Sequence, residues 1–192
     1  MAKLYFRYSA MNSGKTTALI QVAYNYEERH MKVVTVKSAI DTKGNNKIVS
    51  RIGLKRTADI ILKPGDSALE ALKPFGKRHC VLIDEAQFLT PSQVDEFFWY
   101  AVDAKTPVMA YGLRTDFKMQ GFPGATRLLE IAHEIQEIKT ICRCGRKAIL
   151  NGRKVNGEFV SEGEQVAIDG KDNVDYESLC AVCYRRYVSP VK

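Results

Sequence analysis

The segment that follows the first expected strand constrains this chain more than any other feature. Residues 3–8 alternate apolar and polar side chains and lead directly into the run Ser9-Ala10-Met11-Asn12-Ser13-Gly14-Lys15-Thr16. Helical periodicity then begins, because the apolar residues 19, 22, 23 and 26 share one helical face. A strand, a loop that closes with Gly-Lys-Thr and a helix together form the context of a Walker A phosphate loop.

This loop predicts a specific chemistry. Backbone N–H groups of residues 12–16 would converge on phosphate oxygens at the helix N-terminus. Lys15 would bridge the terminal phosphates, and the Thr16 hydroxyl would hold Mg²⁺. The strict pattern begins with glycine where this chain has Ser9. Because that glycine serves the entry turn, we expect phosphate binding to survive the change. An ordinary strand-to-helix turn is the alternative interpretation.

An acidic motif supplies the partner that a phosphate loop needs. The run Val81-Leu82-Ile83-Asp84-Glu85-Ala86-Gln87 predicts a central strand that is buried on both faces and ends in two carboxylates. Asp84 stands where a Walker B carboxylate orients the metal and its water. Glu85 would face the γ-phosphate and accept a proton from water or a substrate hydroxyl. An acidic pair at a solvated strand end is the alternative, but it explains neither the position nor the pairing with Lys15.

The pattern up to residue 139 predicts an α/β domain with a parallel sheet. Strands are expected at 32–37, 58–62, 79–84, 107–113 and 134–139, and helices at 67–72, 90–103 and 125–132. Thr90 and Gln93 supply a capping box for the helix at 90–103, and Pro91 takes its first position. Residues 38–55 are expected to form a long loop. We place a domain boundary near Lys139, so that 1–139 bind the nucleotide and 140–192 form a smaller unit.

The smaller unit contains two close pairs of cysteines. In a reducing compartment, such pairs favour a metal over disulfides, which remain the alternative. Four thiolates at about 2.3 Å from Zn²⁺ would close a tetrahedral structural site with no open position. Cys80 lies in an apolar run and is expected to be a buried core thiol. The expected zinc ligands are Cys142, Cys144, Cys180 and Cys183.

Charge and hydropathy exclude several classes of protein. The chain has 29 Lys and Arg against 22 Asp and Glu, a net charge of +7. This excess favours phosphorylated ligands without reaching the charge density of a dedicated nucleic-acid protein. No apolar run approaches the roughly 20 residues of a membrane span. Since the first residues also lack the apolar core of a secretory signal, we expect a cytoplasmic protein without a membrane or nucleic-acid partner.

The chain contains, in this order, the phosphate loop, an Asp-Glu-x-Gln-Phe segment at the second motif and four cysteines after the last strand. This arrangement resembles that of the cytosolic, zinc-containing thymidine kinases, the type II thymidine kinase family. The resemblance covers nearly the whole chain. Each further match is weak alone, but their order is specific. These matches are Asp41-Thr42-Lys43, Gly112 to Phe117, the turn Gly121–Gly124 and Asp175 to Cys180.

The resemblance implies a RecA-like P-loop sheet, a C-terminal zinc ribbon with a lasso over the nucleoside, and transfer of the γ-phosphoryl group of ATP to the 5′-hydroxyl of thymidine. Glu85 would be the base, and Gln87 would lie near the phosphates. It also implies homotetramers and feedback inhibition by dTTP. The segment Val166–Tyr176 would be the lasso. The expected base pocket comprises Met11, Phe88, Leu113, Phe117 and Tyr176.

Three features depart from the family pattern: Ser9, Cys-x-Cys at the first cysteine pair, and Lys43 where an arginine is often found. Lys43 puts a phosphate contact in question, because a point charge does not replace a bidentate fork.

Two rival functions remain. A nucleic-acid-stimulated RecA-like ATPase is suggested by the run from Asp84 to Gln87 and by a pI of about 9.1, although 192 residues leave no room for a second lobe. The other is a zinc-ribbon binding module whose phosphate loop acts as a nucleotide switch.

Overall fold

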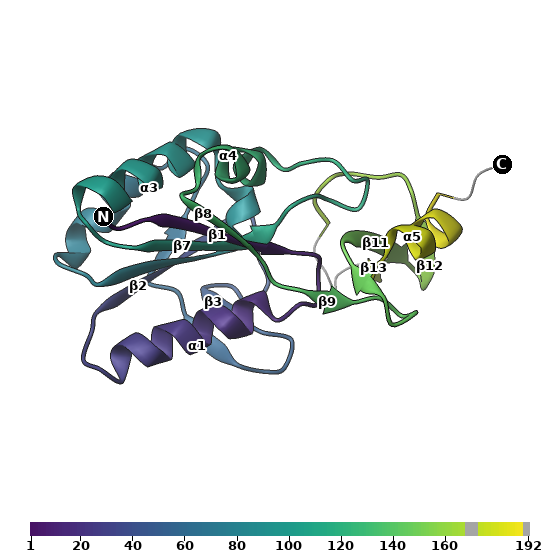
Figure 1. Cartoon of the computed structure of the whole chain (residues 1–192), viewed down its shortest axis with the longest axis horizontal. Helices are drawn as coiled ribbons and strands as arrows, with labels where there is room; N and C mark the ends of the chain where they lie inside the picture. Colours follow the sequence, from purple (N-terminus) through teal and green to yellow (C-terminus); the bar gives the residue numbers. More distant parts are fainter. Residues whose placement is uncertain (168–172, 190–192) are drawn as a thin grey trace.

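A parallel sheet of six strands forms the larger part of the molecule in our computed structural model, which describes residues 1–167 and 173–189 (Figure 1). The strand order is β5-β2-β6-β7-β1-β8, and every neighbouring pair is parallel. The strands of this sheet are β1 (Leu4–Ser9), β2 (Val33–Ser38), β5 (Ile60–Leu62), β6 (Cys80–Asp84), β7 (Val108–Leu113) and β8 (Glu134–Glu137).

Helices cover both faces of the sheet, as parallel strands with crossover connections require. Helix α1 (Lys15–Glu27) lies on one face, while α3 (Pro91–Asp103) and α4 (Pro123–Ile131) lie on the other (Figure 1). The short α2 (Ala68–Leu72) packs beside α3, and two 3₁₀ turns, η1 (Lys73–Phe75) and η2 (Ala86–Phe88), complete this part. All five residues of β6 are buried, so the expected central strand is confirmed.

Local signals in the sequence locate several of these elements. Thr90 caps α3 through a capping box with Gln93, and Pro91 occupies the first turn, as expected. Cys80 is fully buried, and burial raises the pKa of its thiol to about 12. Both findings confirm the sequence analysis.

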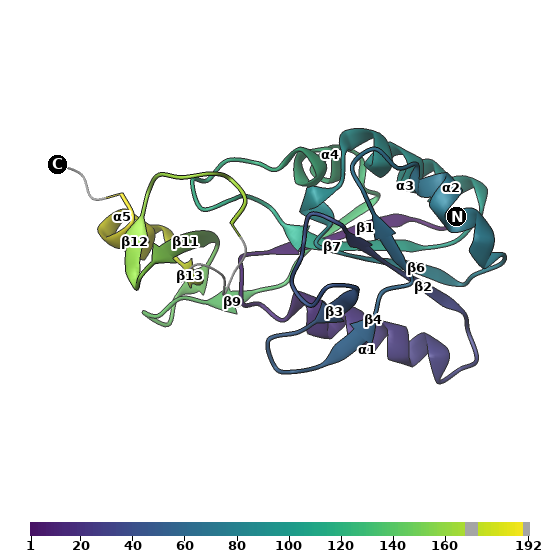
Figure 2. The same ribbon diagram turned by 180° about the vertical axis from the view of Figure 1, so that it is seen from behind.

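The expectation of an unbroken loop over 38–55 is wrong. Strands β3 (Lys47–Val49) and β4 (Lys55–Thr57) form an antiparallel hairpin within and just beyond it, and Figure 2 shows this hairpin beside α1. Ile48 is fully buried in the same apolar cluster as Leu19 of α1. Two apolar residues, Ile48 and Val49, are too short a pattern to indicate a strand, so only the packing against α1 reveals it.

The C-terminal part, which we call the ribbon (140–167 and 173–189), lies at one end of the sheet (Figure 1). It consists of β-hairpins and α5 (Ala181–Tyr187), a helix that the sequence analysis did not anticipate. The hairpins are formed by β9 (Thr140–Ile141) with β10 (Lys147–Ala148) and by β11 (Leu150–Val155) with β12 (Glu158–Val160) and β13 (Val174–Leu179).

The expected lasso, Val166–Tyr176, falls partly within the described residues. Its last residues, Val174 to Tyr176, belong to β13 and pair with β11, so this end is a strand rather than an open loop. Residues 168–172, which carry Asp169 to Asp172, lie outside the described residues. Within the described residues, no helix combines the length and the apolar character that crossing a bilayer requires.

Candidate active site

The phosphate loop joins β1 to α1 and presents its backbone at the helix N-terminus. Gly14 precedes α1 with a φ of 82°, a left-handed conformation that favours glycine. Lys15 is buried, and its ammonium donates hydrogen bonds to Ser9 Oγ at 3.0 Å and to the Ala10 carbonyl at 3.1 Å. Ser9 therefore holds the lysine within the loop, which gives a structural reason why serine can stand in place of the usual glycine.

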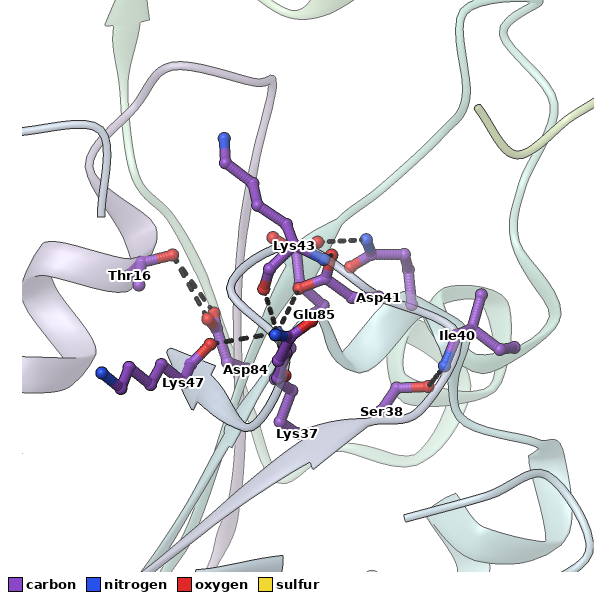
Figure 3. Close-up of polar contacts among 11 residues, drawn as sticks. Thr16, Lys37, Ser38, Ile40, Asp41, Lys43, Lys47, Asp84 and Glu85 are labelled. Atoms are coloured by element: carbon purple, nitrogen blue, oxygen red, sulfur yellow. Dashed lines mark hydrogen bonds and ion pairs between the residues drawn. The ribbon is translucent and has the colours of Figure 1, made fainter. Parts of the chain in front are cut away.

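The two expected carboxylates end β6 directly beside this loop. Although β7 separates β1 from β6, the Thr16 hydroxyl lies 3.3 and 3.4 Å from the two carboxylate oxygens of Asp84 (Figure 3). Glu85 follows with a φ of 50°, and its carboxylate accepts a hydrogen bond from Gln87 Nε2 at 2.5 Å. A left-handed non-glycine residue costs backbone energy and is often found at a functional site.

Gln87 is fixed in turn by the strand β7. Its side-chain oxygen accepts a hydrogen bond from the backbone N–H of Leu113 at 3.0 Å. A Cβ at Gly112 would lie 2.8 Å from that oxygen, so only glycine admits this close approach. The side chain that contacts Glu85 is therefore held in one orientation.

Burial dominates the electrostatics of this cluster. It raises the pKa of Asp84, and the neighbouring Glu85 raises it further, while Lys15 opposes both effects. Burial also raises the pKa of Glu85, which Lys15 lowers and Asp41 raises. Burial lowers the pKa of Lys15, against the attraction of the two carboxylates. Such a set of opposing shifts is typical of a site that handles protons or cations.

A cavity of about 230 Å³ connects these groups with apolar side chains from both parts of the chain. All five expected base-pocket residues line it, together with residues 11–16 of the phosphate loop and both carboxylates. Ser9 and Ala10 do not line it and act on Lys15 instead. Val166 and Ala167 of the expected lasso also line it, as do Asp41, Lys43, Asp116 and Phe122 from the segments that match the family pattern. The sequence analysis missed five further lining residues, namely Val49, Ser50, Arg51, Ile52 and Gln165, and also Asn151.

Polar side chains tether the phosphate loop to the ribbon. The buried Asn151 accepts a hydrogen bond from the Met11 N–H at 2.7 Å and donates one to the Thr115 carbonyl at 2.9 Å. Ser178 donates to the Met11 carbonyl at 2.7 Å, and Asn12 donates to the Tyr176 carbonyl at 3.1 Å. Single polar residues on strands carry no sequence pattern, so these tethers could not be anticipated.

Arg153 organises the apolar end of the cavity. Its guanidinium is buried, lies 3.7 Å from the centre of the Phe117 ring and donates to the Tyr176 hydroxyl at 2.9 Å. It also donates to the carbonyls of Glu164 at 2.6 Å and Gln165 at 3.1 Å. The two residues that precede the expected lasso are thereby held beside two aromatic rings that line the cavity.

The four expected cysteines converge within the ribbon. Their sulfur atoms all lie within 4.8 Å of one another, and all four are free thiols. Tetrahedral Zn²⁺ with bonds of about 2.3 Å needs sulfur atoms roughly 3.8 Å apart, and Cys144 and Cys180 lie at 3.6 Å. A hydrogen bond from the Cys183 backbone lowers the pKa of Cys180, while burial raises the pKa of Cys183. The donor set therefore fits zinc.

Comparison with known proteins identifies the family of this chain. Residues 2–184 match the model of the family described as Thymidine kinase. A thymidine kinase of Pasteurella multocida is 44% identical over 193 residues, covering 98% of this chain and all of the relative. A thymidine kinase of Legionella pneumophila (strain Paris) is 48% identical over 192 residues, covering 97% of this chain and 90% of the relative.

Solved structures are more distant. A crystal structure of Bacteroides Pif1 bound to single-stranded DNA matches with a TM-score of 0.38 and 16% identity, covering 71% of this chain and 38% of that one. This likeness is too low to support an argument about fold or function. The family model, in contrast, matches almost the whole chain, and the thymidine kinase relatives have nearly the same length. The chain therefore belongs to the thymidine kinase family.

Proposed function

We propose that this protein transfers the γ-phosphoryl group of ATP to the 5′-hydroxyl of thymidine and releases dTMP and ADP. The observation that carries this proposal is the shared cavity, which has a phosphate loop with two carboxylates at one end and aromatic side chains at the other. A nucleoside needs apolar walls for its base, while the phosphates need backbone N–H groups and cations. Family membership supports the same activity.

At the phosphate end, residues 11–16 would bind the phosphates of ATP, with Lys15 bridging the terminal ones and Ser9 and Ala10 holding that lysine. Thr16 and Asp84 would hold Mg²⁺, since their oxygens already lie 3.3 Å apart. The ion supplies charge neutralisation on the phosphates when it is bound. Gln87 keeps the Glu85 carboxylate oriented through its hydrogen bond.

Glu85 would act as the general base. The 5′-oxygen of thymidine forms a bond to the γ-phosphorus, the bond to the ADP oxygen breaks, and the hydroxyl proton passes to Glu85. A raised pKa suits this role, because a base works best when its pKa approaches the operating pH.

At the nucleoside end, Met11, Phe88, Leu113, Phe117 and Tyr176 would enclose the thymine ring. Arg153 would hold Phe117 and Tyr176 in place. The lasso would cover the nucleoside and exclude water, which Glu85 could otherwise activate and so waste ATP.

The remaining features complete the proposal. Four cysteines would hold one structural Zn²⁺ in a ribbon domain (140–192) attached to a RecA-like P-loop domain (1–139). We place the enzyme in the cytoplasm as a homotetramer that dTTP inhibits. The zinc site, the location in the cell, the subunit number and the inhibition by dTTP do not enter the chemical step, so each is tested separately from the activity.

The test is to incubate the enzyme with ATP and Mg²⁺ and to compare ADP formation with thymidine, with single-stranded DNA and with neither. Thymidine should raise turnover well above the other two conditions, with dTMP as the product. A panel of nucleosides then defines specificity. Stimulation by DNA alone would indicate the ATPase instead, and tight ATP binding without turnover would indicate the nucleotide switch.

A further inference from the structure

Beyond the groups described above, the phosphate end contains a buried lysine. Lys37 lies near the end of β2, with 1% of its side chain exposed. In the sheet register it is the direct partner of Asp84 on β6. A buried ammonium is costly unless its charge is paired and its three donors are satisfied. The groups that surround the Lys37 ammonium therefore indicate which part of the chain it stabilises.

Within the described part of the chain, the groups that accept hydrogen bonds from the Lys37 ammonium or pair with it belong to one segment, residues 41–47, which we call the carboxylate loop (Figure 3). The ammonium donates to the carbonyls of Asn45 at 3.1 Å and Lys47 at 3.0 Å, and also to the carbonyl of Lys43. The Asp41 carboxylate pairs with it at 3.1 Å. One cation thus joins both ends and the middle of the loop.

The backbone of the carboxylate loop is bent to make these contacts. Gly44 and Asn45 both adopt left-handed conformations, with φ of 72° and 54°. A Cβ at Gly44 would lie 2.6 Å from Val49 Cγ2, so the loop is also packed closely against β3. The Asp41 carboxylate accepts a second hydrogen bond, from the Lys43 N–H at 3.0 Å.

The same loop contributes to the cavity. Asp41 and Lys43 line it, and both influence the pKa of Glu85, which Asp41 raises and Lys43 lowers. Because Lys37 and Asp84 are register partners in one rigid sheet, the loop is tied to the strand pair that positions the carboxylates. Displacing the loop would move two charges relative to Glu85 and to the phosphates of ATP.

We propose that Lys37 is a positioning residue for phosphoryl transfer, which acts through the carboxylate loop by fixing Asp41 and Lys43 beside the phosphates. This inference rests on the proposed function. A positioning role predicts that loss of the Lys37 ammonium lowers kcat/KM for ATP. A lysine that only stabilised the fold would change the melting temperature and leave the kinetic constants unchanged.

The test compares Lys37→Met with Lys47→Met in the full-length enzyme. Methionine keeps an unbranched, apolar stem and removes the ammonium. Lys47 is exposed and offers only its backbone carbonyl to Lys37, so Lys47→Met makes the same change in the same loop without breaking the contact. Amide hydrogen exchange of residues 41–47 and the KM values for ATP and thymidine are measured for both variants.

Lys37→Met should raise exchange in the carboxylate loop and lower kcat/KM for ATP by roughly 10- to 100-fold, the scale expected when a reacting group is misplaced. The KM for thymidine should change by less than about threefold, and Lys47→Met should match the wild type. Unchanged loop exchange, or a loosened loop with unchanged use of ATP, would overturn the role of Lys37.

A second variant covers the case in which Lys37→Met does not fold. Gly44→Ala displaces the exposed loop through its left-handed φ and its contact with Val49, and it leaves every charge in place. It should reproduce the ATP-specific defect, and wild-type kinetics despite a displaced loop would contradict the proposal. A wild-type enzyme that fails to phosphorylate thymidine would overturn the proposed function instead, while the exchange comparison would still test whether Lys37 holds the loop.

Discussion

The sheet and the ribbon differ in what holds them together. The sheet buries a continuous apolar core that extends through β1, β2, β6 and β7 to α3 and α4. Three of the eight buried residues in the ribbon's cluster are cysteines. Burial of apolar surface can stabilise the sheet by itself, whereas so small a core usually needs a metal or cross-links. The ribbon should therefore depend on its cysteines, and the sheet should not.

The cavity draws on both parts, with a different task for each. The sheet carries the phosphate loop, Asp84 and Glu85, and the ribbon carries Asn151, Arg153 and Tyr176. Changes at the phosphate loop and its two carboxylates should therefore affect the chemical step, while changes in the ribbon, like changes to the base-pocket residues of the sheet part, should affect nucleoside binding. This division can be tested by comparing kcat with the KM values.

The largest expected effect comes from removing the base in the sheet. Glu85→Gln keeps the size of the side chain, and its amide oxygen can still accept the hydrogen bond from Gln87. The amide, however, cannot accept the proton of the substrate hydroxyl. We expect kcat to fall by roughly 10²- to 10⁴-fold, while ATP binding measured by calorimetry stays near that of the wild type. Activity within a few-fold of the wild type would remove Glu85 from the mechanism.

The second-largest expected effect comes from removing a zinc ligand in the ribbon. The wild type should contain one equivalent of zinc per chain by elemental analysis. Cys183→Ser should lose the metal and the slow hydrogen exchange of β11 and β13, while β6 and β7 keep theirs. Turnover of thymidine should fall with the loss of ribbon order, and ATP binding should persist. The same substitution at Cys80 should keep the metal, because that thiol lies in the sheet core.

Four disulfide-bonded cysteines without metal in the purified protein would contradict the zinc site. Loss of protection in β6 on Cys183→Ser would contradict the independence of the two parts.

A smaller effect is expected where the two parts meet. Asn151→Ala leaves the Met11 N–H and the Thr115 carbonyl without their partner. An unsatisfied buried group costs about 1–3 kcal/mol, so we expect the KM for thymidine to rise by roughly 10-fold with the zinc content unchanged. Asn151→Asp keeps the acceptor for Met11 and should recover part of the loss. If neither variant changes the KM, the tether does not shape the nucleoside end.

The parts of the site that the sequence predicts are those built from contiguous residues. The phosphate loop needs a strand, Gly14 and Lys15 in order, and Asp84 and Glu85 follow a strand whose apolar run is evident. The cysteine pairs have metal-ligand spacing. In each case, the local chain already holds the chemistry, so the pattern can be recognised before the fold is known.

The parts of the fold and the site that the sequence does not predict depend on contacts between distant segments of the chain. In the sequence, Lys37 is an ordinary polar residue near the end of a strand, and the adjacent residues do not indicate that a loop folds around its ammonium. Asn151 and Arg153 lie on a strand far along the chain from Met11 and Phe117, which they contact. The β3–β4 hairpin has one buried anchor, Ile48. Tertiary packing decides all of these features.

The smallest expected effect tests whether stability of the sheet can be separated from the site. Thr90 caps α3 by accepting a hydrogen bond from the Gln93 N–H at 3.2 Å, and the Gln93 side chain accepts one from the Thr90 N–H at 3.0 Å. Thr90→Ala removes the first bond at a cost of about 1 kcal/mol, which denaturant unfolding would measure. Because Thr90 does not line the cavity, kcat and both KM values should match those of the wild type. Thr90→Ser keeps the hydroxyl and should restore most of the stability. A kinetic defect in Thr90→Ala would show that α3 communicates with the site through η2, and the assignment of stability and chemistry to separate features of the sheet would then be wrong.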